Sequence, residues 1–181
     1  MKPRIIALAL AAFAFALPVF ADTPSSPYSG QQTRSIKALS DEDVAGLVKG
    51  EGLGMAKAAE LNGYPGPKHV LILAKELRLT DAQRQQVQVI FDRMNAAARP
   101  LGMELVGHEL LLDRLFAEGE ITPDRLAVET ASIGTLEGSL RSVHLAAHLQ
   151  TRALLNAHLI ALYKQLRGYD TPTAPIHHHH D

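Results

Sequence analysis

Residues 79 to 116 read LTDAQRQQVQVIFDRMNAAARPLGMELVGHELLLDRLF, and this stretch decides the fold. It begins with Thr80 as a candidate N-cap and Gln83 three residues later, which is the spacing of a helix capping box. After this start, one row of mainly apolar residues recurs at alternating steps of four and three. Such a row predicts a long helix with one continuous face that packs against a partner helix. The residues in that row are Val87, Phe91, Met94, Ala98, Leu101, Leu105, His108, Leu112 and Leu115.

The partner helix is predicted directly downstream. Gly119 interrupts the pattern, and Thr122 followed by Pro123 restarts it with a capping residue and a proline at the first helical position. Folding the chain back near residue 119 places Leu105 close to Leu136, as expected for antiparallel helices joined by a short loop. The second apolar row consists of Leu126, Ile133, Leu136, Leu140, Val143, Ala147 and Leu154.

Shorter helices are predicted on both sides of this hairpin. Ser40 is the candidate N-cap of a helix that runs to about residue 61, and residues 69 to 77 form a second short helix. Asn156 is the candidate cap of a last helix over residues 157 to 167.

Pro100 lies inside the first long helix, where it should kink or divide the helix and bend the hairpin. The predicted fold class is therefore all-α. It consists of a long bent antiparallel helical hairpin with shorter N- and C-terminal helices.

Residues 1 to 21 match a cleavable secretory signal, with a positive start, an apolar run and a small-residue cleavage site at Ala21. A membrane anchor is the alternative, but the run is short for a span and Pro18 interrupts its end. We therefore expect a periplasmic protein without a membrane span after cleavage. Residues 22 to 39 predict a flexible arm because they are rich in Ser, Thr, Pro, Gly and Gln. Residues 40 to 169 form the predicted helical domain.

Composition argues against several classes of function. Residues 22 to 181 carry 16 Lys and Arg against 19 Asp and Glu, without a basic stripe, so nucleic acid is not an expected partner. The chain has no cysteine, which excludes a disulfide, a thiolate metal site and a thiol nucleophile. It also lacks the GxSxG, HExxH and GK[ST] motifs of common enzyme classes. We expect no enzymatic activity and no required cofactor.

His144 and His148 are the strongest candidates for a binding site. They lie four residues apart on the second long helix, so their Cβ atoms are about 6 Å apart on one face. Two imidazoles at this spacing can hold a Zn²⁺, Ni²⁺ or Cu²⁺ ion. The register places Asp92 and Asn95 opposite them, where Asp92 would be a third ligand or would orient an imidazole. The alternative is a polar edge of the hairpin, with Asp92 as an ion-pair partner.

The other histidines have separate explanations. His108 lies in the apolar row opposite Ser132, which predicts a simple buried hydrogen bond. The tail, residues 170 to 181, is expected to be disordered and contains His177, His178, His179 and His180. Four consecutive imidazoles can bind nickel, zinc or copper without any fold. A remnant of a purification tag is the alternative explanation for this run.

Three features together resemble the LTxxQ-motif family of periplasmic proteins. They are the motif at Leu79, Thr80 and Gln83, the long hairpin behind a signal peptide, and the closing segment RALLNAHLIALYKQLRGY. The family includes the Spy- and CpxP-type stress proteins, the ZraP-like proteins and the periplasmic heavy-metal sensors. A second motif would fall on residues 155 to 159, where only the leucine and a capping residue remain. The resemblance implies an all-helical fold, often a homodimeric cradle, without catalysis.

The expected function is that of a periplasmic stress protein that binds metal ions, unfolded protein or both. Apolar residues left over from the hairpin seam would form a homodimer interface, a contact for the N-terminal helices or a surface for unfolded clients. The alternative function is a metal-responsive sensor domain that regulates an envelope sensor protein in the membrane. The apolar residues left over from the hairpin seam are Ile90, Ala97, Leu110, Leu111, Leu145 and Leu149.

Overall fold

The computed structural model describes residues 26 to 170. The predicted signal peptide and the histidines at 177 to 180 lie outside the described residues. The chain divides into two units, residues 1 to 32 and residues 33 to 181. The first contributes a turn and the start of the 3-10 helix η1 (Gln31–Thr33), and the rest of the description concerns the second unit.

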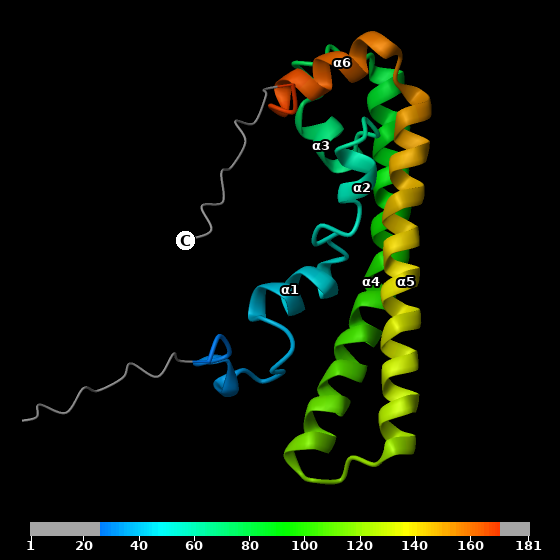
Figure 1. Cartoon of the computed structure of the whole chain (residues 1–181). Helices are drawn as coiled ribbons and strands as arrows, with labels where there is room; N and C mark the ends of the chain where they lie inside the picture. The colour runs from blue at the N-terminus through cyan, green and yellow to red at the C-terminus, as the bar shows by residue number, and fades with distance from the viewer. Residues whose placement is uncertain (1–25, 171–181) are drawn as a thin grey trace, which may run out of the picture. The chain divides into compact units, whose positions relative to one another are not determined.

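Two long helices form the centre of the second unit (Figure 1). α4 spans Asp81–Ala117 and α5 spans Pro123–Leu154, and the two pack antiparallel side by side. The predicted capping box is present, because the Thr80 hydroxyl accepts a hydrogen bond from the Gln83 N–H at 3.2 Å and the Gln83 side chain accepts one from the Thr80 N–H at 3.1 Å. The all-α fold and its antiparallel hairpin are thus confirmed. Within residues 26 to 170, no helix is both long and apolar enough to cross a membrane.

Pro100 does not divide the first long helix. α4 continues through it without interruption to Ala117. A proline removes the one N–H that would bond to the carbonyl four residues earlier, here that of Ala96. Both Pro100 and Ala96 are exposed, so water can satisfy the carbonyl that lost its donor, and packing against α5 maintains the helix.

The N-terminal helix is shorter than predicted. α1 spans Asp41–Lys49 and begins with a capping box between Ser40 and Asp43, but it ends at Gly50 instead of continuing to residue 61. Gly50 has φ +74°, and Leu53 and Gly54 follow with φ +42° and +82°. A residue in this left-handed region cannot continue a right-handed helix, and glycine adopts it without steric cost. The chain resumes helical structure only at α2 (Lys57–Glu60).

Two further helices complete the fold. α3 spans Pro67–Ile72, with Pro67 at its first position, and is also shorter than the predicted helix over residues 69 to 77. α6 spans Ala157–Leu166, and the Asn156 side chain accepts a hydrogen bond from the Leu159 N–H at 2.9 Å, as predicted. Both ends of α6 therefore agree with the sequence to within one residue.

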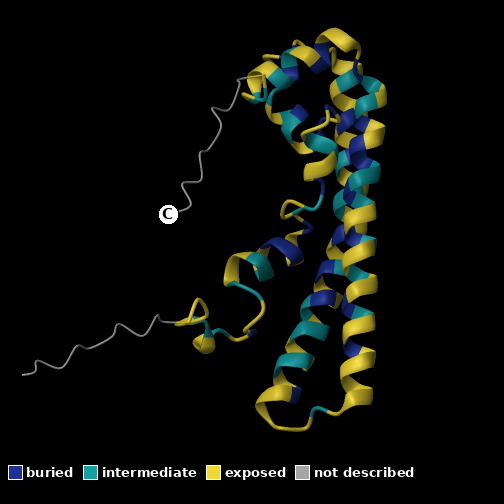
Figure 2. Ribbon diagram, viewed as in Figure 1, coloured by how far each residue is buried: buried dark blue, intermediate teal, exposed yellow. Residues whose placement is uncertain are grey.

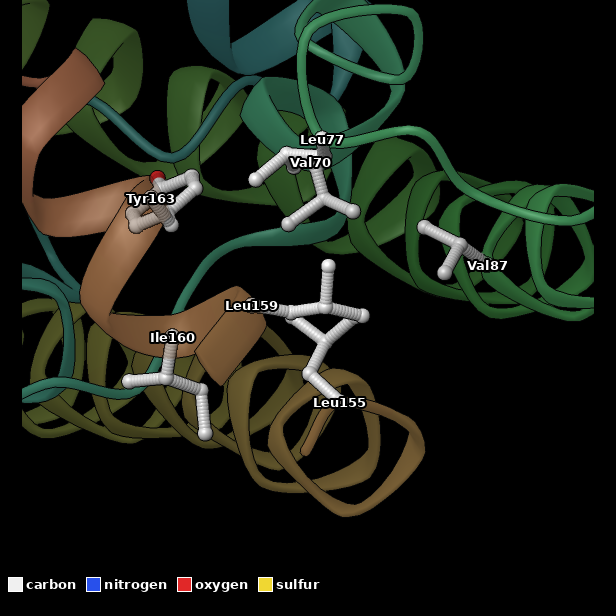
Figure 3. Close-up of a cluster of buried hydrophobic side chains, with 7 residues drawn as sticks. All are labelled: Val70, Leu77, Val87, Leu155, Leu159, Ile160 and Tyr163. Atoms are coloured by element: carbon white, nitrogen blue, oxygen red, sulfur yellow. The ribbon is translucent and has the colours of Figure 1, made fainter. Parts of the chain in front are cut away.

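Buried positions occur along both long helices and in the shorter elements packed on them (dark blue in Figure 2). Their hydrophobic side chains form two clusters. One attaches α1 to the hairpin and contains Leu47, Ala98, Leu105, Ile133 and Leu140. The other joins α3, α4 and α6 at the end of the hairpin where α4 begins (Figure 3). It contains Val70, Leu77, Val87, Leu155, Leu159, Ile160 and Tyr163. Because both clusters combine residues from α4 and from α5 or its C-terminal end, they fix the antiparallel register.

Part of the expected arm packs on α4. Ile36 is only 4% exposed, and Lys37 bonds to Asp113 through its N–H at 3.1 Å and its ammonium group at 2.9 Å. Leu39 packs partly buried against the cluster that contains Leu47. The polar composition of this stretch suggested a flexible segment, but two apolar residues and one ion pair attach residues 36 to 39 to the domain.

Candidate functional site

A cavity of about 560 Å³ lies beside the middle of the hairpin. Its walls come from the α1–α2 connection, the corner before α3, facing sides of α4 and α5, and the chain just after α6. This volume falls in the range of about 300 to 1,000 Å³ that is usual for small-molecule sites. Both histidines of the HxxxH pair, His144 and His148, line it.

His144 lacks the partners that a buried imidazole needs. It is 3% exposed, and its Nε2 atom is buried without a hydrogen bond. Among the described residues, none bonds to its Nδ1 atom either. Gly52 lies against the ring, since a Cβ at that position would come within 3.3 Å of Nδ1. An unsatisfied buried polar group costs about 1 to 3 kcal/mol, and such a group usually has an ordered water or an ion as its partner.

His148 lies one turn further along α5 and is oriented by the corner before α3. Its Nδ1 atom is 2.7 Å from the backbone carbonyl oxygen of Tyr64. A carbonyl only accepts hydrogen bonds, so Nδ1 carries the proton, and Nε2 of the neutral ring keeps its lone pair. Gly66 makes room for this ring, because a Cβ there would lie 2.8 Å from Nε2.

Glu60 lines the cavity from α2 and bonds to residues of α6 and of the chain that follows it. Its Oε1 atom accepts hydrogen bonds from the hydroxyl groups of Tyr163 at 2.5 Å and Tyr169 at 2.9 Å. Its Oε2 atom accepts from the Gly66 N–H at 3.1 Å, and Arg167 Nε lies 3.4 Å from Oε1. Burial and the bond to Glu60 raise the pKa of Tyr163. The hydroxyl of Tyr163 therefore stays protonated and donates.

Two imidazoles at the cavity are held neutral. Burial, reinforced by the neighbouring His148, lowers the pKa of His144. Burial, with Arg167 as the next cause, also lowers the pKa of His69, whose Nδ1 lies 3.8 Å from Glu60 Oε1. A neutral imidazole offers one donor and one acceptor, so these rings can bond to a ligand or, for an unprotonated nitrogen, to a metal ion.

The lowered pKa of His144 predicts a loss of stability in acid. Below about pH 6.5 the unfolded chain takes up a proton at this residue before the folded chain does, so the free energy of unfolding falls with pH until the lower folded pKa is reached. One such group contributes at most about 1.4 kcal/mol per pH unit in that window. We expect urea unfolding at pH 7.5 and pH 5.0 to show a smaller acid loss for His144→Leu than for the unchanged protein. An equal loss in both proteins would contradict this role.

The structure brings together only part of the predicted metal site. His144 and His148 share the cavity, but Asp92 is exposed, does not line it, and accepts a hydrogen bond from Gln88 of its own helix at 2.8 Å. Asn95 does line the cavity, and its amide donates to the Lys49 carbonyl at 2.7 Å. In the part of the chain that the structure describes, no three His, Asp or Glu side chains are grouped as metal ligands. The described residues thus offer a metal ion two imidazoles.

His108 and the Thr80–Gln83 pair have structural roles. His108 Nδ1 lies 2.7 Å from Glu129 Oε2, so its partner is Glu129 and not Ser132 as predicted. Glu129 lies three residues before Ser132 on α5, almost one helical turn away. Its side chain is longer than that of serine and reaches His108 from there. In the motif, Thr80 and Gln83 cap α4, and Gln83 Nε2 also reaches the Leu154 carbonyl at 3.5 Å.

Comparison of this chain with protein-family models, curated proteins and solved structures found no match. The chemistry of the cavity is therefore inferred from its own geometry.

Proposed function

We propose that this protein is a non-catalytic binding protein of the periplasm that holds a metal ion between the imidazoles of His144 and His148. The observation that carries the proposal is the buried His144 ring, which has no protein partner at either nitrogen among the described residues. A bound ion would satisfy it. The bond from His148 to the Tyr64 carbonyl supports the same proposal, because metal-binding histidines usually donate their second N–H to a carbonyl or carboxylate.

The ligand types favour a late transition metal. Imidazole nitrogens suit zinc, copper and nickel, and thioether sulfur selects for copper(I). Met94 of α4 lines the same cavity as the two histidines, so it is the candidate for a third protein ligand. Two or three protein ligands leave at least one coordination position open to water or to another small ligand.

Calorimetric titration with Zn²⁺, Ni²⁺ and Cu²⁺ tests this site. The tail must first be silenced by changing His177, His178, His179 and His180 to alanine in the full chain. We expect this protein to bind about one ion, and we expect the further double variant His144→Ala, His148→Ala to bind none.

His158 provides the control, because it is exposed, lies outside the cavity and can be changed to alanine with no loss of binding. Circular dichroism should show that all variants keep their helices. The site is excluded if the protein with the silenced tail binds no ion, or if the double variant binds as well as its parent.

A second candidate function is the binding of unfolded client protein, with the hairpin tip as the surface. Large apolar side chains there are open to solvent, with exposed fractions between 37% and 61%. Such a patch is typical of an interaction surface, and a second copy of the chain would also fit it. A metal-induced change of oligomeric state would instead favour the sensor function. The exposed apolar residues of the patch at the hairpin tip are Leu110, Leu111, Phe116, Leu126 and Val128.

A further inference from the structure

The cavity is far larger than a metal ion requires. Its volume of about 560 Å³ would hold many water molecules, each of which occupies about 30 Å³ in the liquid. Its lining includes Ala56 and Pro67, both buried, and the half-buried Phe91 and Met94. Water gains little from such surfaces, whereas burial of an organic chain against them is favourable by roughly 25 cal/mol per Å².

Two of the apolar side chains that line the cavity are also exposed to solvent. Leu53 is 43% exposed and Leu61 is 62% exposed, and both line the cavity. These two leucines add exposed apolar surface to the lining of the cavity. A ligand with a long apolar part would bury both of them, which an inorganic ion cannot do.

The charges around the cavity are mainly positive. Four cationic side chains line it, against two carboxylates, Glu51 and Glu60. Glu60 already accepts three hydrogen bonds and pairs with Arg167, and Glu51 lies 3.6 Å from Lys68. Lys49 and Lys57 have no carboxylate within 4 Å in residues 26 to 170. Two uncompensated ammonium groups at a concave apolar surface attract an anion.

The unpartnered imidazole is an independent indication of a ligand. The His144 ring is 3% exposed, and its Nε2 atom is buried without a hydrogen-bond partner in the described residues. His148 adds a second nitrogen, Nε2, to which none of the described residues is bonded. A carboxylate placed in the cavity can accept a hydrogen bond from the N–H of the His144 ring, whereas Nε2 of His148 keeps its lone pair and is left to a water molecule. Lys49 and Lys57 line the same cavity.

We propose that this cavity binds a small amphipathic organic anion, with an apolar chain against Phe91 and Met94 and a carboxylate near Lys49 and Lys57. This goes beyond metal binding and does not depend on it. A neutral lipid would leave the two lysines without counter-charge, and an apolar cation would be repelled by them. The negative charge of the ligand follows from the two lysines, and its apolar chain follows from the apolar residues that line the cavity.

Decanoate is a suitable probe, used below its micelle concentration with the full chain and a metal chelator in the buffer. Calorimetry should show one decanoate bound per chain, at least about tenfold more tightly than decanol, and no binding of decyltrimethylammonium. Equal affinity for the acid and the alcohol would overturn the anion site, and so would the absence of decanoate binding.

Charge variants assign the binding to this cavity. The double variant Lys49→Gln, Lys57→Gln should weaken decanoate binding by about five- to tenfold and leave decanol unchanged, because two exposed charges each contribute up to about 1 kcal/mol. The matched control is Lys75→Gln, Arg141→Gln, which removes the same charge from exposed sites outside the cavity. If both pairs act alike, the proposal fails. Because the chelator removes metal, failure here is separate from failure of the metal titration.

Discussion

Replacing Glu60 with alanine is expected to destabilise the fold by about 3 kcal/mol, because it removes a partly buried carboxylate and leaves the donors that bond to it unsatisfied. The Glu60 side chain is 11% exposed and bonds to three groups while pairing with Arg167. Its loss leaves the hydroxyl of Tyr163, a residue that is 1% exposed, without an acceptor. Urea unfolding followed by circular dichroism measures the change.

Two further variants separate the charge from the hydrogen bonds. Glu60→Gln keeps one carbonyl oxygen and should lose less stability than Glu60→Ala. Glu76→Ala removes an exposed carboxylate and should change the free energy of unfolding by no more than about 0.5 kcal/mol. If Glu60→Ala were as mild as Glu76→Ala, the network around Glu60 would not connect α2 to α6 in the way described.

Gly102→Ala is expected to be the most damaging single methyl addition in α4. A Cβ on Gly102 would lie 2.7 Å from the Leu47 carbonyl carbon and would overlap the Leu47 carbonyl oxygen. These are backbone atoms of α1, so no side-chain rotation can relieve the contact and α1 must move away. Overpacking of this kind costs about 1 to 3 kcal/mol or more. We expect the Gly102→Ala protein to melt at a lower temperature than the unchanged protein and to be cleaved faster by a protease at α1.

Gly107 offers a matched control in the same helix. A Cβ there meets nothing within 4 Å, so Gly107→Ala should stabilise the protein by about 0.5 to 1 kcal/mol through the better helix propensity of alanine. The two substitutions are chemically identical, and opposite signs are expected. Equal effects would mean that α1 does not pack on α4 at Gly102.

The hairpin was predictable because its signals are local. Thr80 with Gln83, and Thr122 with Pro123, mark helix starts within four residues of sequence, and the apolar rows give the two long helices a shared face. The end of α1 was predicted too late. The helix ends at Gly50, whose left-handed conformation depends on how the chain turns after α1 and not on the helix-start signals before it.

The candidate site was predictable only in part. The spacing of His144 and His148 is a local signal, and the structure places both at one cavity. Which side chains of α4 face them depends on the rotation of that helix, which brings Asn95 to the cavity and leaves Asp92 in solvent. Glu60 gave no sequence signal, because its tyrosine partners lie 103 and 109 residues downstream.

The central claim is that His144 and His148 hold a ligand inside the cavity, and anomalous diffraction tests it most directly. Crystals of the protein with the silenced tail would be grown with zinc or copper, and data collected at the absorption edge of the metal. We predict one strong peak inside the cavity, at about 2.0 to 2.1 Å from a ring nitrogen of each histidine. Peaks only at other surface groups, with no density beside His144, would contradict the account.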